Sequence, residues 1–167
     1  SLDISAPVNA TFTFGGGGGS GDTSAVGAVY FNPNGGNLTV GSKTIDVMAN
    51  IGTKSVKGFE VLFDVTGTVP EGISLTTNTI AGLSRLGEVV NTPIEGGRRI
   101  GFTLALTSPT TPFTATSPVK LATLSLTAPT SGTMSTTFNS QFTKINDATT
   151  SLDISAPVNA TFTFGGG

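Results

Sequence analysis

The chain has 167 residues, of which 37% are hydrophobic and 11% are charged, about half the charged share usual in globular proteins. It contains no His and no Cys, so the commonest general base, the commonest metal ligands and the thiol nucleophile are all missing. A net charge of −2 gives no electrostatic reason to bind nucleic acid. No apolar run approaches the roughly 18 residues that indicate membrane insertion. We therefore expect no enzymatic activity, no catalytic or metal site and no cofactor.

The first residues of the chain return unchanged at its end. Residues 1–17, SLDISAPVNATFTFGGG, are identical to residues 151–167, which gives the repeat a spacing of 150 residues. Divergent evolution would have left differences between the two copies. Two origins remain open: recently copied tandem units of about 150 residues, or a second copy that was added by engineering.

Each copy of the repeat has the pattern of a strand with one buried face. Apolar residues occupy every second position from Leu2 to Phe14. Fully extended, these residues would reach about 46 Å, which is longer than an ordinary strand. Pro7 cannot donate a hydrogen bond to a sheet, so the strand should break there or lie at an edge. We predict two short strands in each copy, at 1–5 and 8–14 and at 151–155 and 158–164.

Residues 15–22, GGGGGSGD, read as a flexible linker that reaches at most about 28 Å. A single sandwich normally offers one position for a strand that this chain carries twice. The surplus copy must lie exposed or pair with another molecule, and strand addition to a neighbour satisfies both its backbone and its apolar face. Such a contact is heterologous and builds a filament when it does not close. The residues predicted to make this contact are Leu2, Ile4, Val8, Phe12, Phe14, Leu152, Ile154, Val158, Phe162 and Phe164.

Alternating apolar residues between Gly-, Asn- and Pro-rich turns predict further strands in the rest of the chain. These strands lie at 26–31, 37–40, 43–50, 56–66, 98–106, 119–127 and 133–138, with a weaker pair within 72–82 and a short piece at 141–146 around Phe142 and Ile145. Residues 83–90 fit either a helical turn or a strand, and residues 107–118 read as a loop. At 119–127, Leu121 falls on the face opposite Ala122, which predicts that the start of this strand is covered on both sides. Nine or ten strands in all indicate an all-β sandwich of jelly-roll type.

No arrangement of polar residues stands out as a chemical site. Asn146, Asp147 and Asp153 offer oxygen ligands for calcium, although a turn stabilised by these side chains is the more frequent use of such residues. The eleven Phe lie mostly at core-facing positions, and there is no Trp, so a flat aromatic platform for sugar is not expected.

Residues 30–67 resemble the opening of cohesin-like domains, with a strand, a Pro-Asn-Gly turn, a second strand ending in Asn and a strand of the form V-x-G-F-E. Residues 120–138 are similar to the L-A-T-L strand pair of that family, and residues 145–155 to its closing segment. The resemblance covers most of residues 26–164. It implies a nine-strand jelly-roll sandwich of the kind found in cellulosome scaffolds and multidomain bacterial surface proteins.

One departure from the family pattern bears on the expected partner. The family has a Tyr/Phe-Asp-Pro turn where this chain has Phe63, Asp64 and Val65, and the turn is delayed to residues 70–72. Dockerin recognition therefore does not transfer directly. The family's closing strand is C-terminal, which favours residues 151–164 as the strand that completes its own domain, while the opposite assignment stays open.

Two functions follow as expectations. The first is a structural subunit or repeat of an extracellular fibre or surface protein, self-assembling head to tail by donation of a terminal strand. The second is a cohesin-type module that binds a dockerin-like partner. Low charge with abundant Thr and Ser favours an extracellular or cell-surface location. The chain divides into a duplicated strand segment at 1–14, a linker at 15–22, a β-sandwich at 23–164 and a glycine tail at 165–167.

Overall fold

Thirteen strands and no helix make up residues 21–165, the part of the chain that the computed structural model describes. In chain order the strands are β1 (Ala28–Asn32), β2 (Gly36–Leu38), β3 (Gly41–Ala49), β4 (Val56–Gly67), β5 (Ser74–Thr77), β6 (Leu83–Arg85), β7 (Val90–Ile94), β8 (Gly97–Leu106), β9 (Val119–Ala128), β10 (Thr133–Phe138), β11 (Lys144–Asp147), β12 (Ala156–Pro157) and β13 (Ala160–Phe164). The predicted all-β class is confirmed. Within these residues no helix of the length and apolar character needed to cross a membrane is present.

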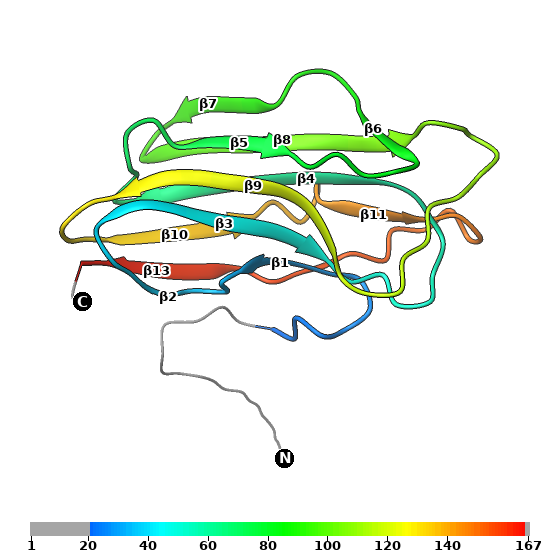
Figure 1. Cartoon of the computed structure of the whole chain (residues 1–167), viewed down its shortest axis with the longest axis horizontal. Coiled ribbons are helices and arrows are strands. Elements are labelled where there is room, and N and C mark those ends of the chain that lie inside the picture. The colour runs from blue at the N-terminus through cyan, green and yellow to red at the C-terminus, as the bar shows by residue number, and fades with distance from the viewer. Residues whose placement is uncertain (1–20, 166–167) are drawn as a thin grey trace, which may run out of the picture.

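Two sheets lie face to face, as Figure 1 shows. The smaller sheet has the order β12-β1-β3-β9-β5, and the larger has the order β2-β13-β10-β4-β8-β6, with β11 pairing along β4 and β7 along β8. Alternate residues of the long strands point into the space between the sheets, because side chains on a strand alternate between its two faces. The largest fully buried side chains are those of Phe31, Phe59, Phe63, Phe162, Ile45, Ile51, Ile100, Leu121, Leu124, Met134, Ile145 and Val29.

Three phenylalanines from different strands form an aromatic cluster in this core. The ring of Phe31 on β1 stacks on that of Phe138 on β10, with centroids 4.6 Å apart and planes inclined by 13°. The ring of Phe63 on β4 meets Phe31 edge-on at 5.1 Å and Phe138 edge-on at 5.8 Å. Because β1 belongs to the smaller sheet and β4 and β10 to the larger, this cluster joins the two sheets.

The long strands lie where the alternation predicted them, and the short strands account for the differences. Residues 74–77 form one strand, β5, instead of the weaker pair expected within 72–82, and Ile80 packs against the core without belonging to a strand. The ambiguous stretch at 83–90 contains the short strand β6. Strand β7 was not predicted and contains Pro93. It pairs with β8 alone, and Pro is tolerated at such an edge because no second partner needs its missing amide.

The predicted double cover at the start of β9 is wrong, because a β-bulge lies there. Met48 pairs with Lys120 while the preceding Val47 pairs with Ala122, so the register shifts by one residue. Leu121 is the extra residue of the bulge, and both Leu121 and Ala122 are fully buried in the same core cluster, against which Val119 also packs.

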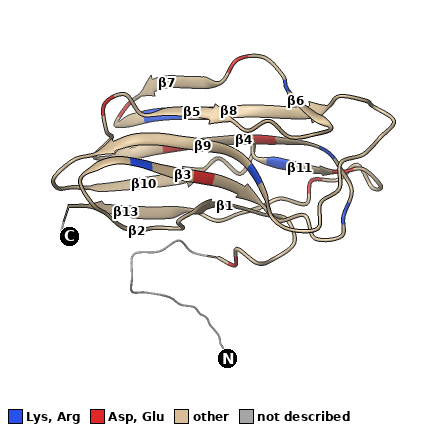
Figure 2. Ribbon diagram, viewed as in Figure 1, with Lys and Arg blue, Asp and Glu red and all other residues tan. Residues whose placement is uncertain are grey.

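Charged residues are scattered over the strands and loops (Figure 2). The best-formed ion pair joins Arg99 on β8 to Asp64 on β4, with both guanidinium contacts at 2.8–3.0 Å. Both side chains are partly exposed, so the pair adds little to stability.

Candidate functional site

The last described residues connect the two sheets. Strand β12 pairs in parallel with β1 at the edge of the smaller sheet. Strand β13 then lies in the larger sheet, antiparallel to β10 on one side and parallel to β2 on the other (Figure 1). We call residues 156–165 the closing segment, and the place that this segment fills, first beside β1 and then between β10 and β2, the closing slot.

Backbone hydrogen bonds fasten the closing segment along its whole length. Its amides donate to carbonyl oxygens in β1 and the residue before it, in β2 and in the turn before β10. These bonds run from Ala156 N to Gly27 O at 2.8 Å, from Val158 N to Val29 O at 2.8 Å, from Phe164 N to Gly132 O at 2.9 Å and from Gly165 N to Leu38 O at 3.1 Å. The segment therefore spans both sheets and covers what would otherwise be an open side of the sandwich.

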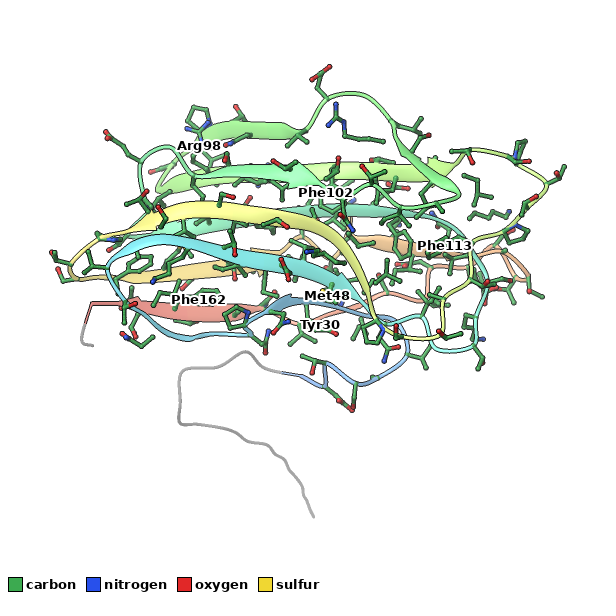
Figure 3. The ribbon with its side chains drawn as sticks, in the orientation of Figure 1. Tyr30, Met48, Arg98, Phe102, Phe113 and Phe162 are labelled. Atoms are coloured by element: carbon green, nitrogen blue, oxygen red, sulfur yellow. The ribbon has the colours of Figure 1, made fainter. Side chains whose placement is uncertain are left out.

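The apolar residues of the C-terminal copy differ in burial. Phe162, Val158 and Phe164 are 0%, 2% and 5% exposed, and Figure 3 shows Phe162 on β13. Ile154 is partly buried against the core, whereas Leu152 is 65% exposed. The residues predicted for strand donation in the N-terminal copy, Leu2, Ile4, Val8, Phe12 and Phe14, lie outside the described residues.

A turn replaces the strand predicted at 151–155. The carbonyl oxygen of Asp147 accepts a hydrogen bond from Ser151 N at 2.9 Å, and Ser151 has a left-handed backbone with φ of 62°. This conformation interrupts the alternation of the repeat, which is why Leu152 faces solvent. One isolated bridge, between Asn146 and Asp153, is the strand-like pairing that residues 151–155 make.

The acidic side chains considered as calcium ligands are used within this turn. Asp147 Oδ1 accepts hydrogen bonds from Thr149 N at 2.7 Å and from Thr150 N at 3.4 Å, and Oδ2 lies 3.6 Å from Lys54 Nζ. The bond from Thr149 N is the main cause that lowers the pKa of Asp147. Asp153 Oδ1 accepts from two backbone amides in the same way. Within residues 21–165 no group of three or more His, Cys, Asp or Glu side chains is placed to hold a metal ion.

An exposed apolar patch lies on the outer face of the larger sheet. We define it by Leu86, Val90 and Phe142, which are 58%, 41% and 51% exposed. The three residues line one shallow depression over β4 and β8, and the acidic residues Glu60 and Glu88 line it too. The sequence does not reveal this patch, because its members are far apart in the chain and Phe142 lies close to Ile145, which is buried.

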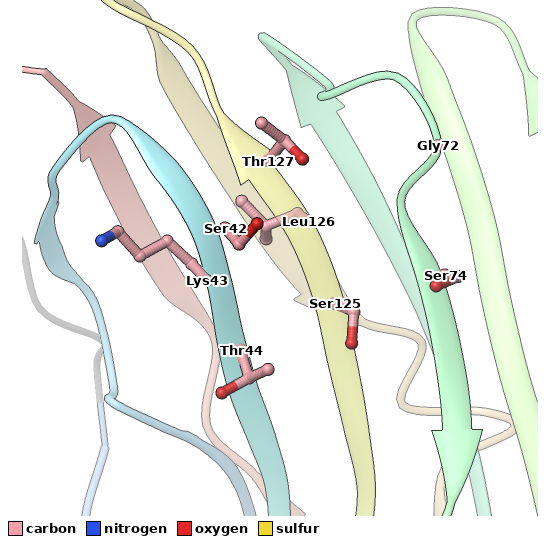
Figure 4. Close-up of a pocket in the computed structure, with 8 residues that line it drawn as sticks. All are labelled: Ser42, Lys43, Thr44, Gly72, Ser74, Ser125, Leu126 and Thr127. Atoms are coloured by element: carbon pink, nitrogen blue, oxygen red, sulfur yellow. The ribbon is translucent and has the colours of Figure 1, made fainter.

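A second depression, on the outer face of the smaller sheet, is lined by hydroxyl side chains (Figure 4). Ser42 and Thr44 on β3 lie opposite Thr127 and Ser125 on β9, and Ser74 on β5 lies opposite Ser125. Exposed hydroxyls of this kind solvate the outer face of a sheet without any ligand. This depression gives no further support to a binding function.

Comparisons with known proteins identify the fold. No protein-family model matches the sequence, and no curated protein matches it. Solved structures do match. The third cohesin of ScaC from Acetivibrio cellulolyticus, in complex with the ScaB dockerin, has a TM-score of 0.54 at 12% identity, and the match covers 83% of this chain and 96% of that chain.

Two further cohesins are similar to the same extent. The OlpC cohesin of Clostridium thermocellum, in a type I complex with Doc435, has a TM-score of 0.51 at 10% identity over 87% of this chain and 98% of that chain. The third ScaB cohesin of R. flavefaciens, in complex with a group 1 dockerin, has a TM-score of 0.51 at 16% identity over 83% of this chain and 96% of that chain. The chain therefore has a cohesin-like β-sandwich fold, which confirms the resemblance seen in residues 30–67.

Proposed function

We propose that this chain is a non-enzymatic structural unit that joins neighbouring copies head to tail, with residues 1–14 of one molecule entering the closing slot of the next. One observation carries the proposal. Residues 156–164 fill that slot in the described structure, and residues 6–14 have the same sequence. Every hydrogen bond and buried side chain of this segment is therefore available to the N-terminal copy of another molecule.

The resident C-terminal copy sets the conditions for this assembly. Replacing the resident copy by an identical one from another molecule adds no contact. The resident copy is covalently attached to its own domain, so a donated copy must compete with an effective concentration on the order of millimolar. Donation between molecules is therefore favoured where units are crowded, as in a fibre or on a cell surface. The low content of charged residues agrees with such an extracellular location.

The length of the linker decides whether the N-terminal copy reaches its own slot. Gly21 lies against Val158, because a Cβ built on Gly21 would be 3.2 Å from Val158 Cγ2. The slot extends about 20 Å from Val158 to Phe164, whereas the chain from residue 14 to residue 21 spans at most about 25 Å. The intact linker can therefore close on its own molecule. Without residues 16–19 it would span about 11 Å and could reach only a neighbour.

The test combines Phe162→Asp, which disables the resident copy, with deletion of residues 16–19. The chain with Phe162→Asp alone is expected to stay folded and mainly monomeric, since its N-terminal copy closes its own slot. The chain with both changes is expected to form head-to-tail oligomers, measured by size-exclusion chromatography with light scattering and by electron microscopy. The deletion alone is the matched control and should remain monomeric. A monomeric doubly changed chain, whether folded or unfolded, would contradict the proposal.

The apolar patch supports a second candidate, a module that captures a dockerin-like partner. Three structural neighbours were solved with dockerins bound, and this chain presents Leu86, Val90 and Phe142 on an exposed sheet face with Glu60 and Glu88 beside them. An apolar surface beside carboxylates suits a partner with apolar side chains next to Lys or Arg.

Binding to the dockerins of those three complexes tests this candidate. Leu86→Ala with Phe142→Ala is expected to weaken any binding at least tenfold in biolayer interferometry, since exposed anchors at the centre of an interface carry most of its energy. The matched control is Val40→Ala, which truncates another exposed apolar residue, one that does not line this depression. Absence of binding to all three dockerins, or equal loss with Val40→Ala, counts against the patch.

A further inference from the structure

We infer that the closing slot is a peptide-recognition site that reads the sequence Val-Asn-Ala-X-Phe-X-Phe-Gly in a single register. The inference rests on the proposed strand donation and names its ligand: an extended peptide with these residues, whether from the same chain or from another copy. In the C-terminal copy, the residues that make up this sequence are Val158, Asn159, Ala160, Phe162, Phe164 and Gly165.

Asn159 fixes the register at one end of the slot. The backbone pairing between β10 and β13 ends at Thr136 and Ala160. Beyond that point, the amide of Phe138 donates to the side-chain Oδ1 of Asn159 at 2.8 Å. Sliding the strand by two residues would place Pro157 or Thr161 there. Pro has no side-chain acceptor, and the Thr hydroxyl sits on a shorter side chain.

Gly165 fixes the register at the other end. Its φ is 80°, in the left-handed region that favours glycine. A Cβ at this position would lie 1.9 Å from the carbonyl oxygen of Thr130, while its amide donates to Leu38 O at 3.1 Å. Sliding the strand so that Thr163 takes this place would therefore bring a side chain into the backbone of the turn before β10.

The order of side-chain sizes blocks the opposite slip. Ala160 is 3% exposed and lies between the larger Val158 and Phe162 on the buried face. The fully buried Thr136 hydroxyl donates to the carbonyl oxygen of Ala160 at 3.0 Å, so β10 packs directly against this position. A slip of two residues in this direction would bring Gly167 to the place of Gly165, where a glycine is accepted. The same slip would move Phe162 into the place of Ala160. A close-packed core does not accept that increase in volume without strain.

Competition between the two copies within the full chain tests the inference. A substitution in the C-terminal copy alone gives the two copies different masses, so hydrogen exchange with mass spectrometry reports which copy is protected. Thr163→Ala, on the exposed face of β13, is the reference for occupancy. Asn159→Ala is expected to shift occupancy toward residues 1–17 by roughly tenfold relative to that reference, the worth of one partly buried hydrogen bond. Ala160→Phe and Gly165→Ala are expected to shift it completely.

Making the same substitution in both copies gives an outcome that does not depend on which copy fills the slot. Ala10→Phe with Ala160→Phe is expected to lower Tm by roughly 5–10 °C, whereas Thr13→Ala with Thr163→Ala is expected to change it by less than about 3 °C. Occupancies that match the reference for all three C-terminal variants, with an unchanged Tm for the Ala10/Ala160 pair, would overturn the inference. A failure of the proposed strand donation would give a different result from a failure of this inference. Residues 1–17 would stay unprotected from hydrogen exchange even with Phe162→Asp. The chain with Ala10→Phe and Ala160→Phe would still be destabilised, because residue 160 belongs to the copy that fills the slot.

Discussion

Phe12→Asp together with Phe162→Asp is expected to abolish the cooperative unfolding transition, whereas Phe162→Asp alone is expected to change stability by less than about 1 kcal/mol. Phe162 is fully buried. Losing a buried Phe costs about 3–5 kcal/mol, and a buried carboxylate without a partner costs several more. That sum approaches the whole stability of an ordinary domain, about 5–15 kcal/mol. In the single variant the N-terminal copy supplies Phe12 in place of Phe162.

Urea unfolding followed by circular dichroism measures this pair of variants against wild type. Phe12→Asp alone is the matched control, and it is expected to be silent because the resident copy stays intact. If Phe162→Asp alone were as damaging as the double change, the N-terminal copy would not be a substitute for the closing strand. In that case the proposal of strand donation would fail while the fold described for residues 21–165 would stand.

The long strands were predictable because each contains its own alternation. Residues 43–50, 56–66 and 98–106 show apolar residues at every second position, and the corresponding strands β3, β4 and β8 begin and end within two residues of the predicted limits. The closing strand was also visible in the sequence, since Phe162 and Phe164 continue such a pattern up to a glycine. The two-residue alternation of apolar side chains is therefore enough to place a strand with one buried face.

The bulge and the apolar patch were not predictable, because both depend on contacts between distant residues. Leu121 turns inward through the register of β9 against β3, which the sequence of β9 does not state. Phe142 follows a turn in which its amide donates to both the carbonyl and the side-chain oxygen of Asn139, so no alternation determines its direction. It meets Leu86 and Val90 only once the sheet has formed.

Leu152 shows how one side chain can end a pattern that the sequence seems to continue. The alternation of the repeat runs through Leu152 and Ile154, but Asp147 draws the chain into a turn by accepting hydrogen bonds from backbone amides that follow it. The repeat contains no residue equivalent to Asp147, which precedes the C-terminal copy by four positions. The neighbouring sequence, and not the repeat itself, thus exposes Leu152.

Phe31→Ala is expected to lower the free energy of unfolding by about 3–5 kcal/mol, the cost of a large cavity in a packed core. Phe31 is fully buried, stacks on Phe138 and meets Phe63 edge-on, so its removal takes one aromatic neighbour from each of them and eliminates the aromatic contact between the two sheets. The matched control is Phe142→Ala, which truncates the same side chain at a half-exposed site and should cost less than about 1 kcal/mol. Chemical denaturation of both variants measures the difference. Equal losses would mean that burial at the joint between the sheets does not stabilise this sandwich.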